Sequence, residues 1–213
     1  MTRVLFFDLG GVVFTDFFSG GEKKLAEVLN VPPSKLLDVY LKTDVPSYSK
    51  GGITDLERWK LFTDELGLPK SYADICINEY YKSYEQIKET VDLIRELALD
   101  GRFRLGILSD QPKGVTDYLR KSYEDVFNLF DQNLVVISAE VKLSKKDPEL
   151  DIYKLAIERS GLSVEDIVFI DNSQNNIDNA ESIGIQGFFF DFKEKTPKVL
   201  VEDLRTYVDN IDR

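Results

Sequence analysis

Short apolar runs with almost no polar interruption constrain the fold of this chain more than any other feature. They are rich in Val, Ile, Leu and Phe and do not alternate with polar residues. A strand of this kind must be buried on both faces, as in a parallel sheet with helices on each side. The sequence predicts five such strands, over residues 3–8, 103–109, 134–138, 167–171 and 187–191.

Amphipathic helices are predicted between the later strands. One ends near Gly101, the next runs from Pro148 to Gly161, and the last has Thr196 as its N-cap and Pro197 at its first position. Their inward faces are predicted to hold Ile87, Val91, Ile94 and Ala98; Ile152, Leu155 and Ala156; and Leu200, Leu204 and Val208. Alternating strands and helices imply right-handed βαβ units, so we expect an α/β fold with a doubly wound parallel sheet.

The segment between the first two strands breaks this alternation, because it contains only helical patterns. The clearest helix has Thr54 as its N-cap, Glu57 as the second member of a capping box, and Gly67 at its end. Its inward residues are predicted to be Leu56, Trp59 and Phe62. We therefore expect an all-helical cap over residues 16–86, inserted in an α/β core of residues 1–15 and 87–213.

The absence of histidine from all 213 residues restricts the chemistry. It excludes Ser-His-Asp arrangements, histidine-ligated zinc and a histidine general base. Nucleophilic attack and proton transfer must come from carboxylates, lysines or a metal-bound water. The single cysteine, Cys76, cannot form an internal disulfide, and its apolar helical surroundings indicate a buried packing residue.

Charge and hydropathy restrict the partners and the location. A formal net charge of -11 argues against a nucleic-acid or anionic-membrane partner. No apolar run approaches the roughly twenty residues of a membrane span, and the first residues lack the pattern of a secretory signal. We expect a cytoplasmic protein, and the sequence leaves open whether it is a monomer or a homodimer.

Candidate site residues follow the predicted strands, because ligands of open parallel sheets bind beyond the carboxyl ends of the strands. Asp8 precedes Gly10 and Gly11, whose backbone N–H groups can approach an anion closely. Each polar residue at a strand end is weak evidence alone, but several at one edge are stronger. The five strand ends are Asp8, Ser109, Ser138, Asp171 and Asp191.

Four segments, in order, resemble the motifs of the haloacid dehalogenase-like (HAD-like) hydrolase superfamily. They are FFDLGGVV at 6–13, LSDQ at 108–111, SAEVKLSKKDP at 138–148 and VFIDNSQNN at 168–176. The run KGGIT at 50–54 is similar to the helical C1-type caps of subfamily I. The likeness covers nearly the whole chain and favours the branch that contains sugar phosphatases and the phosphatase-like N-terminal domains of epoxide hydrolases.

The resemblance implies a role for each matching residue. Asp8 would be the nucleophile that forms a covalent aspartyl intermediate, while Ser109 would hold a phosphoryl oxygen. A lysine would pair with the nucleophile; counting from Ser138 selects Lys145, with Lys146 as the alternative. Mg²⁺ would be held by Asp8, the Gly10 carbonyl, Asp171 and Asn172.

The remaining matches could bind substrate or only stabilise local structure. Backbone N–H groups near Gly10 and Gly11 would contact the phosphoryl group. Asp110 could contact substrate or only favour the start of the next helix. Asn176 could orient Asp171 or cap its own helix.

Two departures from the family pattern bear on activity. Phosphatases of this superfamily usually have a second Asp two residues after the nucleophile as general acid and base, and here that residue is Gly10. The second acidic residue of the fourth motif is Asn172. Asp16 lies at the hinge into the cap. It could be the proton donor or simply a solvated loop residue.

These departures leave three interpretations. The first is a Mg²⁺-dependent phosphatase of a small phosphorylated metabolite with a good leaving group, such as a sugar 1-phosphate or an acyl phosphate. The second is a binding or regulatory protein that keeps the fold without catalysis. The third is a metal-free haloacid dehalogenase, which needs no second Asp; its first motif otherwise differs, and no clear halide-binding arginine is present.

Overall fold

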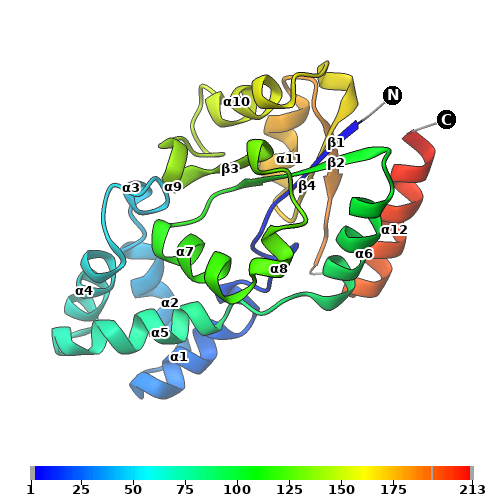
Figure 1. The fold of residues 1–213 in the computed structure, drawn as a ribbon. Helices are drawn as coiled ribbons and strands as arrows, with labels where there is room; N and C mark the ends of the chain where they lie inside the picture. Colours follow the sequence, from blue (N-terminus) through cyan, green and yellow to red (C-terminus); the bar gives the residue numbers. More distant parts are fainter. Residues whose placement is uncertain (1–2, 193, 212–213) are drawn as a thin grey trace.

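The computed structural model describes residues 3–192 and 194–211. Its centre is a five-stranded parallel sheet in the order β3-β2-β1-β4-β5 (Figure 1). The strands are β1 (Arg3–Phe7), β2 (Phe103–Ser109), β3 (Val135–Ile137), β4 (Ile167–Asp171) and β5 (Gln186–Phe189). All five predicted strands are present, and the predicted doubly wound α/β fold is confirmed.

Strands β1, β3 and β5 differ from their predicted bounds. Strand β1 ends at Phe7, one residue earlier than predicted, so Asp8 lies just after it. Leu134 ends a 3-10 turn, η3 (Gln132–Leu134), and Ser138 begins the short helix α9 (Ser138–Val141), so only three residues remain for β3. Strand β5 begins one residue earlier than predicted and ends at Phe189, which leaves Asp191 outside the strand.

Alternate residues of β1 point to opposite faces of the sheet. Leu5 and Phe7 belong to a core cluster with residues of α6 (Lys88–Leu99) and α12 (Pro197–Ile211). Val4 and Phe6 belong to a second cluster with residues of α10 (Asp151–Ser160) and α11 (Gln174–Glu181). The pairs α6/α12 and α10/α11 thus cover opposite faces (Figure 1), as continuous apolarity in the strands requires.

Three predictions about helices are wrong in detail. Ala98 is exposed, and Leu93 and Leu97 complete the buried face of α6. Leu56 is 40% exposed, because Arg58 is inward-facing together with Trp59 and Phe62. Helix α10 begins at Asp151 rather than at Pro148, since residues 144–150 form successive turns that end with Leu150 at a φ of 58°.

The helices of the segment predicted to be a cap are joined by turns, and apart from an isolated β-bridge of Gln86 with Phe14 this fully described segment contains no strand pairing. We call residues 16–86 the helical insertion. Its elements are η1 (Phe17–Ser19), α1 (Gly21–Leu29), α2 (Pro33–Lys42), α3 (Pro46–Ser49), α4 (Asp55–Leu66), η2 (Lys70–Tyr72) and α5 (Ala73–Lys82). The capping box of Thr54 and Glu57 and the left-handed Gly67 are confirmed at the two ends of α4. The rings of Phe17, Tyr40, Phe62 and Tyr80 surround Trp59.

The two connections of the helical insertion run side by side. The Thr15 N–H donates to the Glu85 carbonyl at 2.8 Å, and the Ile87 N–H donates to the Val13 carbonyl at 2.9 Å. The insertion lies at one end of the molecule, beside α7 (Lys113–Ser122) and α9, while α8 (Glu124–Phe127) belongs to the sheet half (Figure 1). The 3-10 turn η4 (Val164–Asp166) directly precedes β4 and contacts β5. Across the described part of the chain, no helix is long and apolar enough to span a membrane.

Candidate active site

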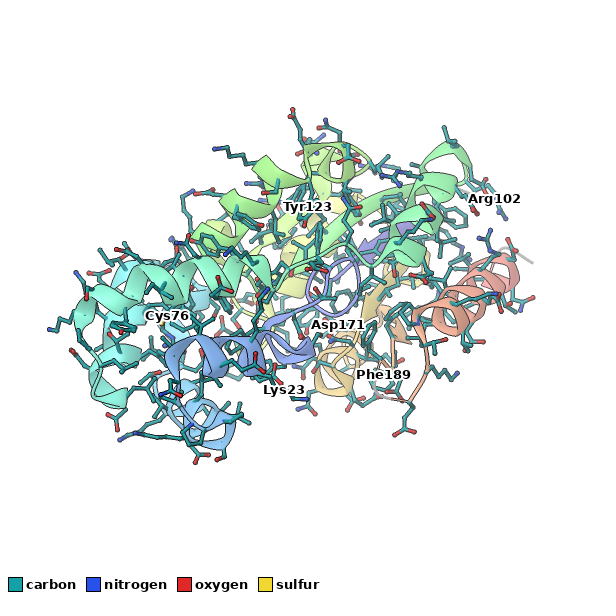
Figure 2. All side chains as sticks on the ribbon, turned by 90° about the horizontal axis from the view of Figure 1, so that it is seen from below. Lys23, Cys76, Arg102, Tyr123, Asp171 and Phe189 are labelled. Atoms are coloured by element: carbon teal, nitrogen blue, oxygen red, sulfur yellow. The ribbon has the colours of Figure 1, made fainter. Side chains whose placement is uncertain are left out.

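Two carboxylates lie at the point where the strand order reverses. Asp8 directly follows β1, Asp171 ends β4, and these strands pair in parallel, with Phe7 opposite Ile170. The Asp8 N–H donates to the Ile170 carbonyl at 2.9 Å, which fixes the start of the loop. Asp171 is fully buried and Asp8 is 7% exposed, and Asp171 lies in the middle of the molecule (Figure 2).

Lys145 joins the two carboxylates. Its Nζ lies 2.8 Å from Asp8 Oδ1 and 2.6 Å from Asp171 Oδ2, and its side chain is buried. Lys146 is exposed, so the structure brings Lys145 and not Lys146 to Asp8. The match obtained by counting forward from Ser138 is therefore the one that reaches the candidate nucleophile.

The electrostatics of this cluster follow from two carboxylates that share one lysine. Burial and the neighbouring Asp171 raise the pKa of Asp8 from 3.8 to about 6, although Lys145 opposes the shift. Burial alone would lower the pKa of Lys145, but the charges of Asp171, Asp8 and Asp110 outweigh burial and raise it well above 10.5. With Asp8 and Asp171 ionised, their cluster with Lys145 holds one uncompensated negative charge.

Asp171 is held by more than the lysine. Its Oδ1 accepts the Ser173 N–H at 2.7 Å, and the Asn176 side-chain amide donates to both of its carboxylate oxygens, at 3.2 and 3.0 Å. Asn176, predicted to contact substrate or to orient Asp171, thus reaches Asp171. These hydrogen bonds fix the carboxylate at the end of β4 so that it faces Asp8 and Lys145.

The loop after Asp8 is tight and packs against two site residues. Gly11 has a φ of 76°, and its N–H donates to the Phe14 carbonyl at 2.7 Å. A Cβ on Gly11 would lie 1.9 Å from Asn172 Nδ2, so only glycine fits beside Asn172. Ser109 Oγ is buried and accepts the Leu9 N–H at 3.3 Å, which places Ser109 against the start of the same loop.

Two side chains from other segments border the space where the family's second Asp would lie. A Cβ on Gly10 would meet Gln111 Nε2 at 3.2 Å and Asp16 Cβ at 3.6 Å. Gln111 is 5% exposed, and its Oε1 accepts the Tyr84 hydroxyl at 3.4 Å. Gln111, Tyr84 and Asp16 therefore border the candidate nucleophile on the Gly10 side.

Magnesium requires hard oxygen ligands, often one or two carboxylates together with waters and substrate oxygens. Asp8 and Asp171 supply two buried carboxylates, and their uncompensated charge would be neutralised by a cation. Among the described residues, no group of three acidic, cysteine or histidine side chains could hold a metal. A magnesium site would therefore also need the predicted ligands Gly10, through its carbonyl, and Asn172, through its amide oxygen, and these neutral donors fit the ion.

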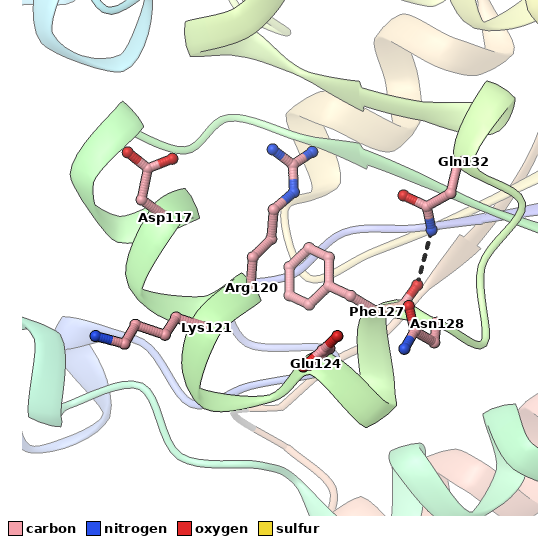
Figure 3. Close-up of a pocket in the computed structure, with 7 residues that line it drawn as sticks. All are labelled: Asp117, Arg120, Lys121, Glu124, Phe127, Asn128 and Gln132. Atoms are coloured by element: carbon pink, nitrogen blue, oxygen red, sulfur yellow. Dashed lines mark hydrogen bonds between the residues drawn. The ribbon is translucent and has the colours of Figure 1, made fainter.

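A surface hollow lies elsewhere, over α7 and α8, and contains none of the predicted site residues (Figure 3). Charges of both signs line it, and Gln132 Nε2 donates to the Phe127 carbonyl at 3.1 Å. The residues that line it are Asp117, Arg120, Lys121, Glu124, Phe127, Asn128 and Gln132.

Asp8, Lys145 and Asp171 thus meet where the strand order of the parallel sheet reverses. Most of the sequence also matches one protein family. The family model described as haloacid dehalogenase-like hydrolase matches residues 2–184. The chain belongs to this family. The expected HAD-like resemblance is thus confirmed, and the chain is an HAD-like hydrolase.

Solved structures share the fold of this HAD-like hydrolase. It is similar to the HAD family enzyme BT-2542 from Bacteroides thetaiotaomicron, solved in complex with magnesium and inorganic phosphate. The two are 21% identical, with a TM-score of 0.70 over 92% of this chain and 98% of that chain. It is also similar to the L-2-haloacid dehalogenase RSc1362, with 21% identity and a TM-score of 0.73 over 98% of this chain and 99% of that chain.

Asp110 has partners that sequence reasoning missed. Its carboxylate accepts the Ser144 hydroxyl at 2.7 Å and the Lys145 N–H at 3.0 Å, so it holds the loop of this HAD-like hydrolase that contains Lys145. Asn179 adds a further support, because its Nδ2 donates to the Lys145 carbonyl at 3.1 Å. No signal in the sequence pairs Asp110 with a loop 34 residues away, since that contact depends on how β2 and the segment after β3 are placed.

Proposed function

We propose that this HAD-like hydrolase is a Mg²⁺-dependent phosphatase that acts on a small phosphorylated metabolite through an aspartyl-phosphate at Asp8. The observation that supports this most directly is the buried contact of Lys145 with both Asp8 and Asp171. One cation between two carboxylates leaves negative charge that a divalent metal would balance, and it places an ammonium group beside the nucleophile. Both features suit the transfer of a phosphoryl group, whose oxygens are negatively charged.

The residues of this chain account for the two chemical steps. An Asp8 oxygen attacks phosphorus, and the bond from phosphorus to the leaving oxygen breaks. Lys145 and Ser109, with the Gly10 backbone N–H, would stabilise the phosphoryl oxygens, whereas the Gly11 N–H already donates to the Phe14 carbonyl within the loop. Water then cleaves the aspartyl-phosphate, which releases phosphate and restores Asp8. Mg²⁺ held by Asp8, Asp171, Asn172 and the Gly10 carbonyl would neutralise phosphoryl charge.

The substrate class follows from the missing second Asp. General acid catalysis is worth about a hundred- to ten-thousandfold in rate, and it matters most for poor leaving groups. Gly10 offers no side chain, and the Gln111 amide beside it cannot give up a proton near neutral pH. The nearby Asp16 carboxylate accepts the Ser19 hydroxyl at 2.7 Å in its own loop, so we do not assign it the role of proton donor. We therefore propose a substrate with a good leaving group, such as a sugar 1-phosphate or an acyl phosphate.

The deciding experiment measures phosphate release from para-nitrophenyl phosphate and from a panel of sugar and acyl phosphates, with Mg²⁺ and with chelator. We expect metal-dependent turnover that Asp8→Asn reduces to background. The matched control is Asp125→Asn, which changes an exposed carboxylate paired with Arg95 and should keep full activity. Turnover that survives Asp8→Asn would contradict the proposal.

Gly10 also favours a second candidate, a haloacid dehalogenase, because halide leaves without needing a proton. An L-2-haloacid dehalogenase shares the fold, as many hydrolases of this family do. Halide release from 2-haloacids, unaffected by chelator and lost in Asp8→Asn, would replace the phosphatase proposal. The absence of turnover in both assays would favour a binding role.

A further inference from the structure

The loop that contains Lys145 is held from two sides. On the core side, Asp110 accepts hydrogen bonds from the Ser144 hydroxyl and the Lys145 N–H. On the other side, Asp147 Oδ2 accepts the Ser144 N–H at 2.9 Å, while Asp147 Oδ1 pairs with Lys50 Nζ of the helical insertion. One carboxylate thus joins the lysine loop to the insertion.

Lys50 lies where the insertion docks on the core. The preceding Ser49 carbonyl accepts the Ser138 hydroxyl at 2.6 Å, and the following Gly51 carbonyl accepts Lys142 Nζ at 3.3 Å. Residues 49–51 of the insertion therefore contact residues 138–142, which lead directly into the lysine loop. We call this set of contacts the docking seam.

The two sides of the docking seam lie so close together at Gly51 that no larger residue fits there. Gly51 has a φ of 65°, and a Cβ there would lie 2.8 Å from Lys142 Nζ and 3.0 Å from the Ala139 carbonyl oxygen. The seam also shares a residue with the sheet edge, because Ser138 Oγ accepts the Gln111 N–H at 3.0 Å. The position of the insertion is thus tied to the carboxyl ends of β2 and β3.

We infer that Asp147 is a positioning residue that couples docking of the helical insertion to the placement of Lys145. The effect of this coupling on turnover rests on the proposed function, whereas its effect on the position of the lysine loop does not. Without Lys50 beside it, Asp147 would lack its cationic partner, and its hold on the Ser144 N–H would be weaker. Ser144 is the residue before Lys145, so a shift at that amide displaces the lysine backbone directly.

The electrostatics of Asp147 agree with a link that depends on Lys50. Burial opposes ionisation of Asp147, but hydrogen bonds from Lys50 and the Ser144 N–H outweigh burial and lower its pKa below 3.8. A purely local turn, closed by Asp147 and Ser144, would not respond to Lys50. A response of the Ser144 amide to the loss of Lys50 therefore distinguishes a coupling role of Asp147 from a purely structural one.

Amide hydrogen exchange tests the coupling without any need for turnover. We compare the native protein with Lys50→Met and with a matched control, Lys42→Met, which breaks the Lys42–Glu65 pair inside the insertion. Lys50→Met should speed exchange at the amides of Ser144 and Lys145, while Lys42→Met should leave them unchanged. Faster exchange confined to residues 46–52 would overturn the inference.

Kinetics give the second measurement. Lys50→Met and Asp147→Asn should each lower kcat by up to about a hundredfold, as expected for a misplaced group. The double variant should lose little more than either single one, and Lys50→Arg should restore the rate. A raised KM with unchanged kcat in Lys50→Met alone would mean that Lys50 binds substrate instead. If the native protein lacks turnover, the proposed function fails, and the exchange measurement alone decides the coupling.

Discussion

Asp8, Asp171 and Lys145 form a cluster whose composition suits chemistry better than stability. Burying two carboxylates against one lysine leaves a charge without a partner, and buried charge is costly unless paired. Hydrogen bonds from Ser173 and Asn176 stabilise the ionised Asp171, so the free-energy cost of burying the extra charge falls mainly on Asp8. Active sites commonly lower the stability of the fold in this way.

This cost predicts that Asp8→Asn stabilises the folded protein. The pKa of Asp8 rises from 3.8 to about 6 on folding. At about 1.4 kcal/mol per pKa unit, ionised Asp8 lowers the free energy of unfolding by at most about 3 kcal/mol at neutral pH. Urea unfolding with chelator present should therefore give a higher midpoint for Asp8→Asn than for the native chain, whereas Asp125→Asn should change little.

The sign of this effect sets its pH dependence. Between about pH 4 and pH 6 the folded state holds more protons on Asp8 than the unfolded state, so its contribution to stability falls as pH rises through this window. The advantage of Asp8→Asn should be near zero at pH 4 and complete above pH 6. An advantage that is largest at pH 4 would contradict the raised pKa.

Cys76, unlike Asp8, is a potentially reactive residue that burial makes unreactive. It is fully buried in α5, inside the helical insertion, and burial raises its pKa to about 12. Ellman's reagent should therefore not modify the native protein at pH 8, and one thiol should react in denaturant. Ser71→Cys, which adds a thiol at an exposed position, should gain one fast-reacting group. Fast modification of the native chain would show that the insertion opens.

Among single residues, the sequence predicted those at strand ends and missed their supports. Asp8 and Asp171 follow apolar strands, and strand ends of a parallel sheet meet at one edge, so their proximity was predictable. The contact of Asp110 with Ser144 was not, because a turn of unpredicted shape sets the position of the lysine loop. For the same reason the sequence, although it selected Lys145 by counting from Ser138, left Lys146 open as an alternative.

At the scale of elements, apolar runs predicted the strands better than turn residues predicted the helix starts. Burial on both faces leaves a strong signal in every strand. The start of α10 was misplaced because Pro148 suggested a first helical turn, while the turns after Ser144 delay the helix to Asp151. Those turns position Lys145. The place where the rule that proline marks a helix start fails is therefore the candidate site.

The docking seam predicts different effects for two left-handed glycines. Gly51 and Gly67 have φ values of 65° and 74°, so alanine at either should cost about 1 kcal/mol or more. A Cβ on Gly67 meets nothing within 4 Å, whereas one on Gly51 meets Lys142 and Ala139. Gly51→Ala should therefore also lower kcat and speed exchange across residues 138–147. Equal kcat in the two variants would contradict a functional seam.

At the scale of the whole molecule, the insertion and the sheet share one apolar cluster. Phe17, Leu25 and Trp59 of the insertion belong to the same buried cluster as Phe7 and Val91 of the core. The sequence predicted an insertion but not how it docks, because the contacts join side chains to backbone carbonyls of distant segments. A shared cluster means that neither part can lose its packing without exposing the other.

Trp59, the single tryptophan, allows this to be measured, since it reports on the insertion alone. Its fluorescence and the far-UV circular dichroism of the whole chain should give the same urea midpoint, because one cooperative unit unfolds at once. Asp8→Asn should raise both midpoints equally, although Asp8 lies outside the insertion. If Trp59 reported an earlier transition, unmoved by Asp8→Asn, the insertion would unfold independently, and the stability of the site could not depend on its docking.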